Sequence, residues 1–102
     1  MIVVRGYARL HPDDMAAARA IASWMVTETR RENGCIDYAF AEDLLEPGLI
    51  RVSELYRDEA ALALHLGSPL MARFNAELGK LRVLGVKVVA YTAAGERVLM
   101  GG

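Results

Sequence analysis

The spacing of apolar residues changes along this chain in an order that few folds accommodate. Apolar residues alternate over Ile2–Leu10, recur every three or four residues in the next segment, and alternate again in two successive stretches. A second helical segment and a valine-rich last strand follow. The order β-α-β-β-α-β is that of the split βαβ unit of ferredoxin-like folds. We therefore expect an α+β sandwich, in which a four-stranded antiparallel sheet carries the helices on one face.

Specific residues mark where the elements of the first half begin and end. His11-Pro12-Asp13-Asp14 interrupts the first strand and offers a carboxylate to cap a helix that begins at about Pro12 or Asp13. Asn33-Gly34, a pair suited to the left-handed backbone conformation, ends that helix. In the following segment Ile36, Tyr38 and Phe40 alternate with smaller or polar residues and predict the second strand.

In the second half of the chain a turn, a helix-capping residue and a break between two helical pieces mark the ends of the elements. The turn is Glu46-Pro47-Gly48, so the strand after it runs antiparallel to the second strand. Asp58 is placed to cap a short helix, and Gly67-Ser68-Pro69 divides the helical segment into two pieces. The predicted ranges are a third strand at Leu49–Tyr56, a short helix capped by Asp58 and running through Leu66, a helical piece that carries Leu70, Phe74, Leu78 and Leu81, and a last strand at Val83–Tyr91.

The chain of 102 residues contains no linker or internal repeat, so we expect one domain spanning residues 1–102. Hydrophobic residues make up 54% of it, which is high for a domain whose small size leaves much of its surface exposed. The predicted sheet also has a face without helices, which carries Val3 and Tyr7. Because a second copy can cover this face, we expect a homodimer in which the residues after Tyr91 reach the partner.

Charge, cysteine content and hydropathy exclude several classes of partner. The 12 Lys and Arg residues nearly balance the 13 Asp and Glu residues without long runs of one sign, so we expect no nucleic-acid partner. Met1–Arg5 is too short for a signal peptide and no apolar run reaches the roughly 20 residues of a membrane span, so we expect no membrane association. The single cysteine, Cys35, suits the reducing cytoplasm. His11 and His65 lie on separate predicted elements without metal-ligand spacing, so we expect no metal site.

His65 is the candidate acid–base group. It follows Leu62 by three residues on the short helix, next to the break at Gly67-Ser68-Pro69, so its ring could reach a space between helix and sheet. An imidazole exchanges a proton near neutral pH, which the deprotonation of a phenol or quinol requires. The alternative is a structural histidine whose ring bonds a backbone carbonyl at the helix end.

Glu54 and Tyr56 share one face of the third strand with apolar neighbours. A carboxylate in such surroundings needs a partner, so Glu54 either orients His65, binds an arginine of a facing subunit, or forms a purely structural hydrogen bond. The ring of Tyr56 can stack on a planar ligand. Apolar stripes at helical spacing are usually plain core, but they also offer candidates for a ligand cavity. These further candidates are Trp24, Met71, Phe74 and Asn75.

Two segments resemble the signature of the antibiotic biosynthesis monooxygenase superfamily. Glu32–Tyr38 has the form Glu-x-Gly-Cys-x-x-Tyr that opens the second strand of that family. Glu54–His65, followed by Ser68-Pro69, has a strand that ends in Glu-x-aromatic, a short helix with Ala-Leu and His, and then a small residue and proline. The likeness is closest to the quinol-monooxygenase branch. It implies a dimeric α+β barrel and oxygenation that needs no cofactor, neither metal nor flavin.

Other branches of the superfamily differ from this chain at specific positions. The polyketide hydroxylases carry Asn, Trp and Tyr where this chain has Val52, Tyr56 and Leu62. The haem degraders carry Asn, Trp and an iron-ligating His where this chain has Tyr7, His65 and Asn75. The chemistry of these branches is therefore not carried over intact.

The leading hypothesis is a cofactor-independent monooxygenase that acts on a small quinol, phenol or polycyclic aromatic molecule. His65 would deprotonate the substrate and Glu54 would tune His65. Tyr56 and Phe74 would hold the ring in a cavity between the helices and the sheet, with Trp24 in its apolar lining. The alternatives are a non-catalytic small-ligand-binding or structural dimer of the same fold and, third, a haem-binding or haem-degrading protein.

Overall fold

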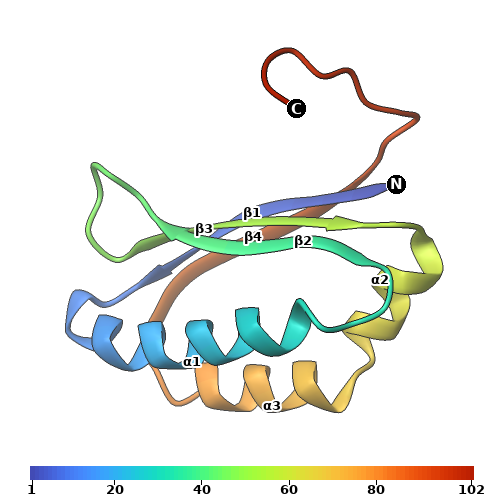
Figure 1. The fold of residues 1–102 in the computed structure, drawn as a ribbon. Coiled ribbons are helices and arrows are strands. Elements are labelled where there is room, and N and C mark those ends of the chain that lie inside the picture. Colours follow the sequence, from blue (N-terminus) through green and yellow to red (C-terminus); the bar gives the residue numbers. More distant parts are fainter.

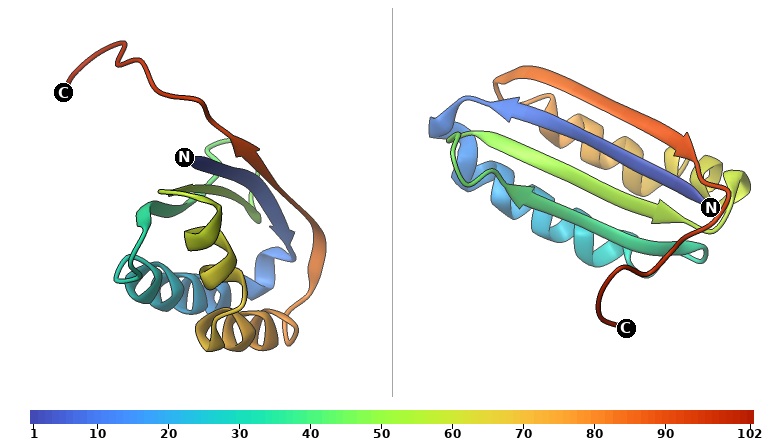
Figure 2. Two further views of the ribbon diagram at one scale, coloured as in Figure 1. Left: turned by 90° about the vertical axis from the view of Figure 1, so that its right-hand side faces the viewer. Right: turned by 90° about the horizontal axis from the view of Figure 1, so that it is seen from above.

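The computed structural model describes all 102 residues and has the expected order of elements (Figure 1). One antiparallel sheet has the strand order β2-β3-β1-β4. Its strands are β1 (Ile2–Leu10), β2 (Cys35–Glu42), β3 (Leu49–Tyr56) and β4 (Val83–Thr92). The helices α1 (Met15–Thr29), α2 (Glu59–Leu66) and α3 (Pro69–Leu78) cover one face of this sheet (Figures 1 and 2). The ferredoxin-like α+β fold predicted from the sequence is confirmed.

Strand register assigns each side chain to one of the two sheet faces. Val4 of β1 lies opposite Glu54 of β3 and Ala90 of β4, so these three side chains share the face that the helices cover. Tyr7 lies opposite Arg51 and is on the uncovered face. Side chains of the covered face and of the helices form the core, which includes Met25 packed against Tyr38 and Phe74.

The first helix begins and ends differently from the sequence-based prediction. A 3₁₀ turn at Pro12–Asp14 precedes α1, and α1 ends at Thr29, before Asn33-Gly34. The predicted capping role of the aspartates is wrong. Asp14 makes no capping bond, because its carboxylate accepts hydrogen bonds from the backbone and guanidinium of Arg82 at 2.8 to 3.1 Å. These bonds lower the pKa of Asp14 to about 2.

The helix α2 ends at Leu66 as predicted, whereas α3 ends at Leu78, so the prediction that Leu81 belongs to this helix is wrong. The strand β4 extends one residue beyond its predicted end, to Thr92.

The Asp58 carboxylate accepts the Ala61 N–H at 2.8 Å at the start of α2. The Ser68 hydroxyl accepts the Met71 N–H at 3.1 Å, with Pro69 as the first residue of α3. The expected break between two helical pieces is therefore present.

The second strand departs from simple alternation at its first residues. Cys35 pairs with Tyr56 and Asp37 pairs with Leu55, so a bulge lies between them and Ile36 falls inside it. Ile36 is exposed, and Cys35 packs with the core in its place. The prediction that Ile36 shares a face with Tyr38 and Phe40 is wrong, because the bulge shifts the alternation by one residue.

The chain after β4 leaves the sheet on the side away from the helices (Figures 1 and 2). Val98, Leu99 and Met100 in this segment are all exposed, Met100 by 92%. No helix of the structure has both the length and the apolar character needed to cross a membrane.

Candidate active site

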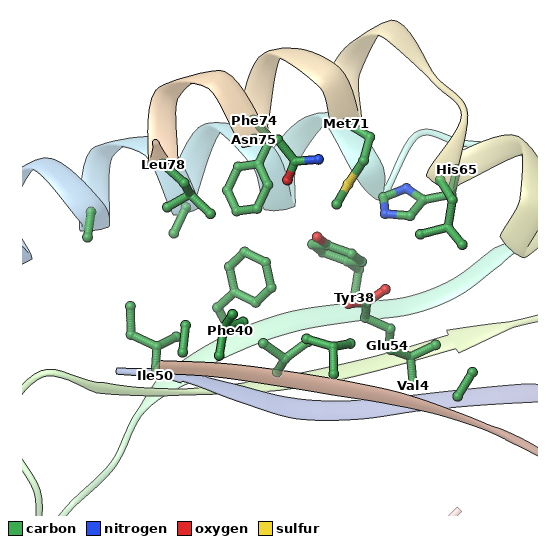
Figure 3. A pocket seen from close by; sticks show the side chains of 18 of the residues that line it. Val4, Tyr38, Phe40, Ile50, Glu54, His65, Met71, Phe74, Asn75 and Leu78 are labelled. Carbon is green, nitrogen blue, oxygen red and sulfur yellow. The ribbon is translucent and has the colours of Figure 1, made fainter. Parts of the chain in front are cut away.

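A cavity of about 370 Å³ lies between the sheet and the helices (Figure 3). Its floor comes from the covered face of the sheet and its roof from α1, α2 and α3. Of the 20 lining residues 17 are hydrophobic, and the other three are Glu54, His65 and Asn75. Small-molecule sites are typically about 300–1,000 Å³ and mostly apolar with a few polar groups. The cavity therefore suits a small, mostly apolar ligand.

The cavity has a buried end and an open end. The edge strand β4 supplies Val86 and Val88, which are 63% and 50% exposed although they line the cavity. These residues are exposed because β4 is an edge strand of the sheet and no helix packs closely against it. His65 and Glu54 are buried and lie deep in the site, whereas Asn75, the third polar residue of the lining, is exposed.

The imidazole of His65 is held in one orientation at the buried end. Its side chain is 2% exposed, and Nδ1 lies 3.0 and 3.3 Å from the two carboxylate oxygens of Glu32. The rings of Tyr38 and Tyr56 flank it, with centroids 5.5 and 5.4 Å away. A carboxylate only accepts hydrogen bonds, so Nδ1 carries the proton and donates it to Glu32. In the neutral imidazole Nε2, which has no protein partner, is then an acceptor, and the ring points into the cavity (Figure 3).

Glu54 supplies a second acceptor beside His65. Its Oε1 accepts a hydrogen bond from the Tyr56 hydroxyl at 2.6 Å, and Oε2 has no protein partner. Burial raises the pKa of the Glu54 carboxyl, while the Tyr56 bond and nearby His65 act in the opposite direction. Burial and the bond to Glu54 raise the pKa of Tyr56, so this hydroxyl keeps its proton and remains the donor.

Aromatic rings form the middle of the cavity wall. Phe40 and Phe74 stack with centroids 5.9 Å apart, and Tyr38 lies 5.1 Å from Phe40 in a tilted arrangement. Such faces pack well against a planar ring. No group of three or more His, Cys, Asp or Glu side chains is arranged to hold a metal ion.

Comparison with known proteins connects this geometry to a family. The family model described as antibiotic biosynthesis monooxygenase matches residues 1–77. The chain belongs to the antibiotic biosynthesis monooxygenase family. The matched segment contains Glu32, Glu54 and His65, and β4 lies beyond it.

Two relatives of this family member illustrate the similarity. The Mycobacterium tuberculosis protein named "Putative monooxygenase Rv0793" is 38% identical over 81 residues, which cover 78% of this chain and 79% of that protein. Its solved structure matches with a TM-score of 0.84 at 32% identity, over 95% of this chain and 98% of the other. A Deinococcus radiodurans structure, described as a putative antibiotic biosynthesis monooxygenase, matches with a TM-score of 0.93 at 29% identity, over 99% and 100% of the two chains.

Most of the site residues predicted for this antibiotic biosynthesis monooxygenase family member do line the cavity. They are His65, Glu54, Met71, Phe74 and Asn75. Tyr56 and Trp24 do not line it, contrary to the prediction. Tyr56 lies under α2, where Ala61 and Leu62 cover its ring. Trp24 is out of phase with Ala18 and Ala22, the cavity-facing residues of α1, and its ring packs against the Arg73 guanidinium at 4.5 Å.

Two residues of the site were missed as candidates, although both belong to the Glu-x-Gly-Cys-x-x-Tyr segment. Glu32, rather than Glu54, hydrogen-bonds His65. Tyr38 flanks the imidazole and lines the cavity. The two polar ends of this segment were the available signal. Glu32 at its start hydrogen-bonds His65, and Tyr38 at its end lines the cavity.

Proposed function

We propose that this antibiotic biosynthesis monooxygenase family member oxygenates a small phenol or quinol, whose hydroxyl it binds at the buried end of the cavity, without a bound metal or flavin. Two hydrogen-bond acceptors at the buried end of a mostly apolar cavity carry this proposal. His65 Nε2 is an acceptor because Nδ1 donates to Glu32. In the ionised Glu54 carboxylate, Oε1 accepts the Tyr56 hydroxyl proton and Oε2 is left as a free acceptor.

A pair of acceptors selects a ligand that presents O–H donors. A phenol or hydroquinone hydroxyl donates its proton to one of them, whereas a quinone offers only carbonyl oxygens, which accept and pair with neither. Leaving a buried polar group unpaired costs about 1–3 kcal/mol. The cavity should therefore bind the reduced, hydroxylated ring in preference to its quinone.

The proposed chemistry begins with proton transfer from the substrate hydroxyl to His65 Nε2. The resulting phenolate is electron-rich enough to reduce dioxygen, which enters as the co-substrate. For a hydroquinone with a free ring position, the hydroquinone and one O₂ give a hydroxyquinone and one water. One oxygen atom enters a ring C–H bond, the other leaves as water, and the substrate itself supplies all the electrons.

The protein contributes orientation and exclusion of water. The stacked rings of Phe40 and Phe74 hold a planar substrate against the sheet, with its hydroxyl toward His65. Low exposure of His65 and Glu54 keeps the proton transfer in a dry environment, where fixed polar groups act more strongly than in water.

The test is oxygen uptake with a panel of hydroquinones, including menadiol, compared with the same solutions without protein. We expect acceleration for at least one hydroquinone and, under ¹⁸O₂, one labelled atom in the organic product. An anaerobic incubation is the control and should give no product. If nothing in the panel is accelerated, the monooxygenase proposal fails, and quinol binding measured by calorimetry then tests the ligand-binding alternative.

We further propose that two copies pair through the uncovered sheet face. Val3, Tyr7 and Leu55 lie on that face, and the exposed Val98–Met100 segment extends beyond it (Figure 1). We expect a dimer at micromolar concentration with more than roughly 2,000 Å² buried in total.

Deleting residues 95–102 should raise the dissociation constant at least about tenfold, since each buried large apolar side chain contributes about 1.5–3 kcal/mol. Sedimentation that shows a monomer for the full chain contradicts this proposal.

A further inference from the structure

Glu32 lies outside the cavity wall, yet it makes the only side-chain hydrogen bonds to the imidazole of His65. It is in the turn between α1 and β2, at a distance of 33 residues from His65 in the sequence. Nothing in the proposed substrate contacts requires a carboxylate at this position. Its placement therefore needs a separate explanation.

The turn that carries Glu32 is fixed on both sides. The Glu32 N–H donates to the Thr29 carbonyl at 3.0 Å, and the Arg57 N–H donates to the Gly34 carbonyl at 2.8 Å, which ties the turn to the end of β3. Gly34 has φ of +88°, and a Cβ there would lie 2.6 Å from the Ala61 Cβ of α2. Only glycine allows this turn to pack so closely against α2. Ala61 precedes His65 by one helical turn, so the close packing brings Glu32 to the imidazole.

Exposure differs sharply along this pair. The His65 side chain is 2% exposed and the Glu32 side chain is 23% exposed. The other titratable groups close to the imidazole are Tyr38, Tyr56 and Glu54, all buried. Among these groups Glu32 alone connects the buried end of the cavity with bulk water. A ligand that occupies the open end would block the other route.

We propose that Glu32 is the positioning residue of His65, which it holds as the Nδ1–H tautomer, and that it passes the Nδ1 proton to solvent when Nε2 takes the substrate's proton. This inference rests on the proposed function. When Nε2 takes the proton of the substrate hydroxyl, the O–H bond breaks and an Nε2–H bond forms. The Nδ1–H bond then breaks in favour of a Glu32 O–H bond, and Glu32 releases the proton to water. His65 returns to its starting tautomer after Nε2 and Nδ1 exchange protons with water once the product has left.

The first arm of the test is independent of catalysis. ¹⁵N NMR of the neutral imidazole of His65 reports which ring nitrogen carries the proton. We expect Nδ1–H in the wild type and in Glu32→Gln, whose amide oxygen still accepts, and a majority of Nε2–H in Glu32→Ala. A wild-type spectrum dominated by Nε2–H overturns the inference, whether or not the protein turns over a quinol.

The second arm measures steady-state kinetics with the best hydroquinone of the panel. Both variants should lose on the order of 10- to 100-fold in kcat with little change in KM, because the substrate contacts remain. Formate should restore part of the kcat of Glu32→Ala and leave the wild type unchanged, since the vacated position is open to solvent. Glu77→Gln, which removes a surface carboxylate paired with Lys80, is the matched control.

The outcomes separate the two proposals. Wild-type kcat in Glu32→Gln overturns the proton-transfer role of Glu32. Absence of any wild-type turnover overturns the proposed function instead, and the tautomer measurement still decides whether Glu32 positions His65. If Glu32→Ala does not fold, Glu32→Gln keeps the shape of the side chain and carries the kinetic test alone.

Discussion

Replacing His65 with alanine should lower the turnover of the quinol substrate by roughly 10²-fold or more, because it removes the base that takes the hydroxyl proton. His65 Nε2 has no bond to the protein and belongs to the one imidazole that lines the cavity. The remaining acceptor, Glu54, lies on the floor of the cavity beside it. Turnover is measured as oxygen uptake per folded molecule, with the folded fraction taken from circular dichroism.

The control for this prediction is the other histidine. His11 accepts a hydrogen bond from the Asp13 N–H at the start of a 3₁₀ turn and does not line the cavity, so His11→Ala should leave turnover unchanged. Because His65 is buried between two tyrosine rings, His65→Ala also loses packing, and His65→Gln provides a variant of closer size. If both His65 variants are less stable and yet retain full activity per folded molecule, His65 is structural and the proposed base is wrong.

The elements of the fold were predictable because their signals are local. Alternation defines β1 and β3, Asp58 caps the helix that directly follows it, and Gly67-Ser68-Pro69 marks the break between the two helical pieces. The start of α1 was predicted incorrectly because Asp14 bonds Arg82, a partner 68 residues away that no local pattern indicates. Ile36 was misplaced because the bulge depends on pairing with β3.

The sequence predicted site residues that lie on the apolar face of a single helix or strand, but it did not predict contacts between elements. His65, Glu54 and Phe74 were found because they lie on apolar faces of single elements, and the structure brings these faces together. The partner of His65 was missed because Glu32 belongs to another element and reaches it only through the packing of Gly34 on α2. Tyr56 was assigned to the correct sheet face, but α2 covers that position. Sequence alternation specifies a face, and only packing decides which part of it is cavity.

Replacing Glu54 with glutamine should lower quinol turnover by roughly 10²-fold and at the same time make the protein more stable at neutral pH. The activity loss follows from the hydrogen bonds. The amide of the Glu54→Gln variant would keep an oxygen for the Tyr56 hydroxyl and would turn an N–H donor toward the cavity in place of Oε2. The variant should therefore bind the quinone better relative to the quinol than the wild type does, which competition calorimetry with both forms of one ring measures.

The stability gain follows from the pKa of Glu54, which burial raises above its ordinary value of 4.5. The folded state then binds this proton more tightly than the unfolded state, so the wild type loses stability as the pH rises from about 4.5 through the folded-state pKa, and the loss persists above it. Glu54→Gln lacks this loss. The difference in melting temperature between variant and wild type should therefore be smallest at the acidic end of a pH 4–8 series, grow with pH and then level off.

Glu59→Gln, which changes an exposed carboxylate in the first turn of α2, should not show this pattern. A Glu54→Gln protein that is less stable than the wild type throughout the series would mean that the charged carboxylate stabilises the fold through Tyr56, and the stability prediction drawn from the raised pKa of Glu54 would be wrong.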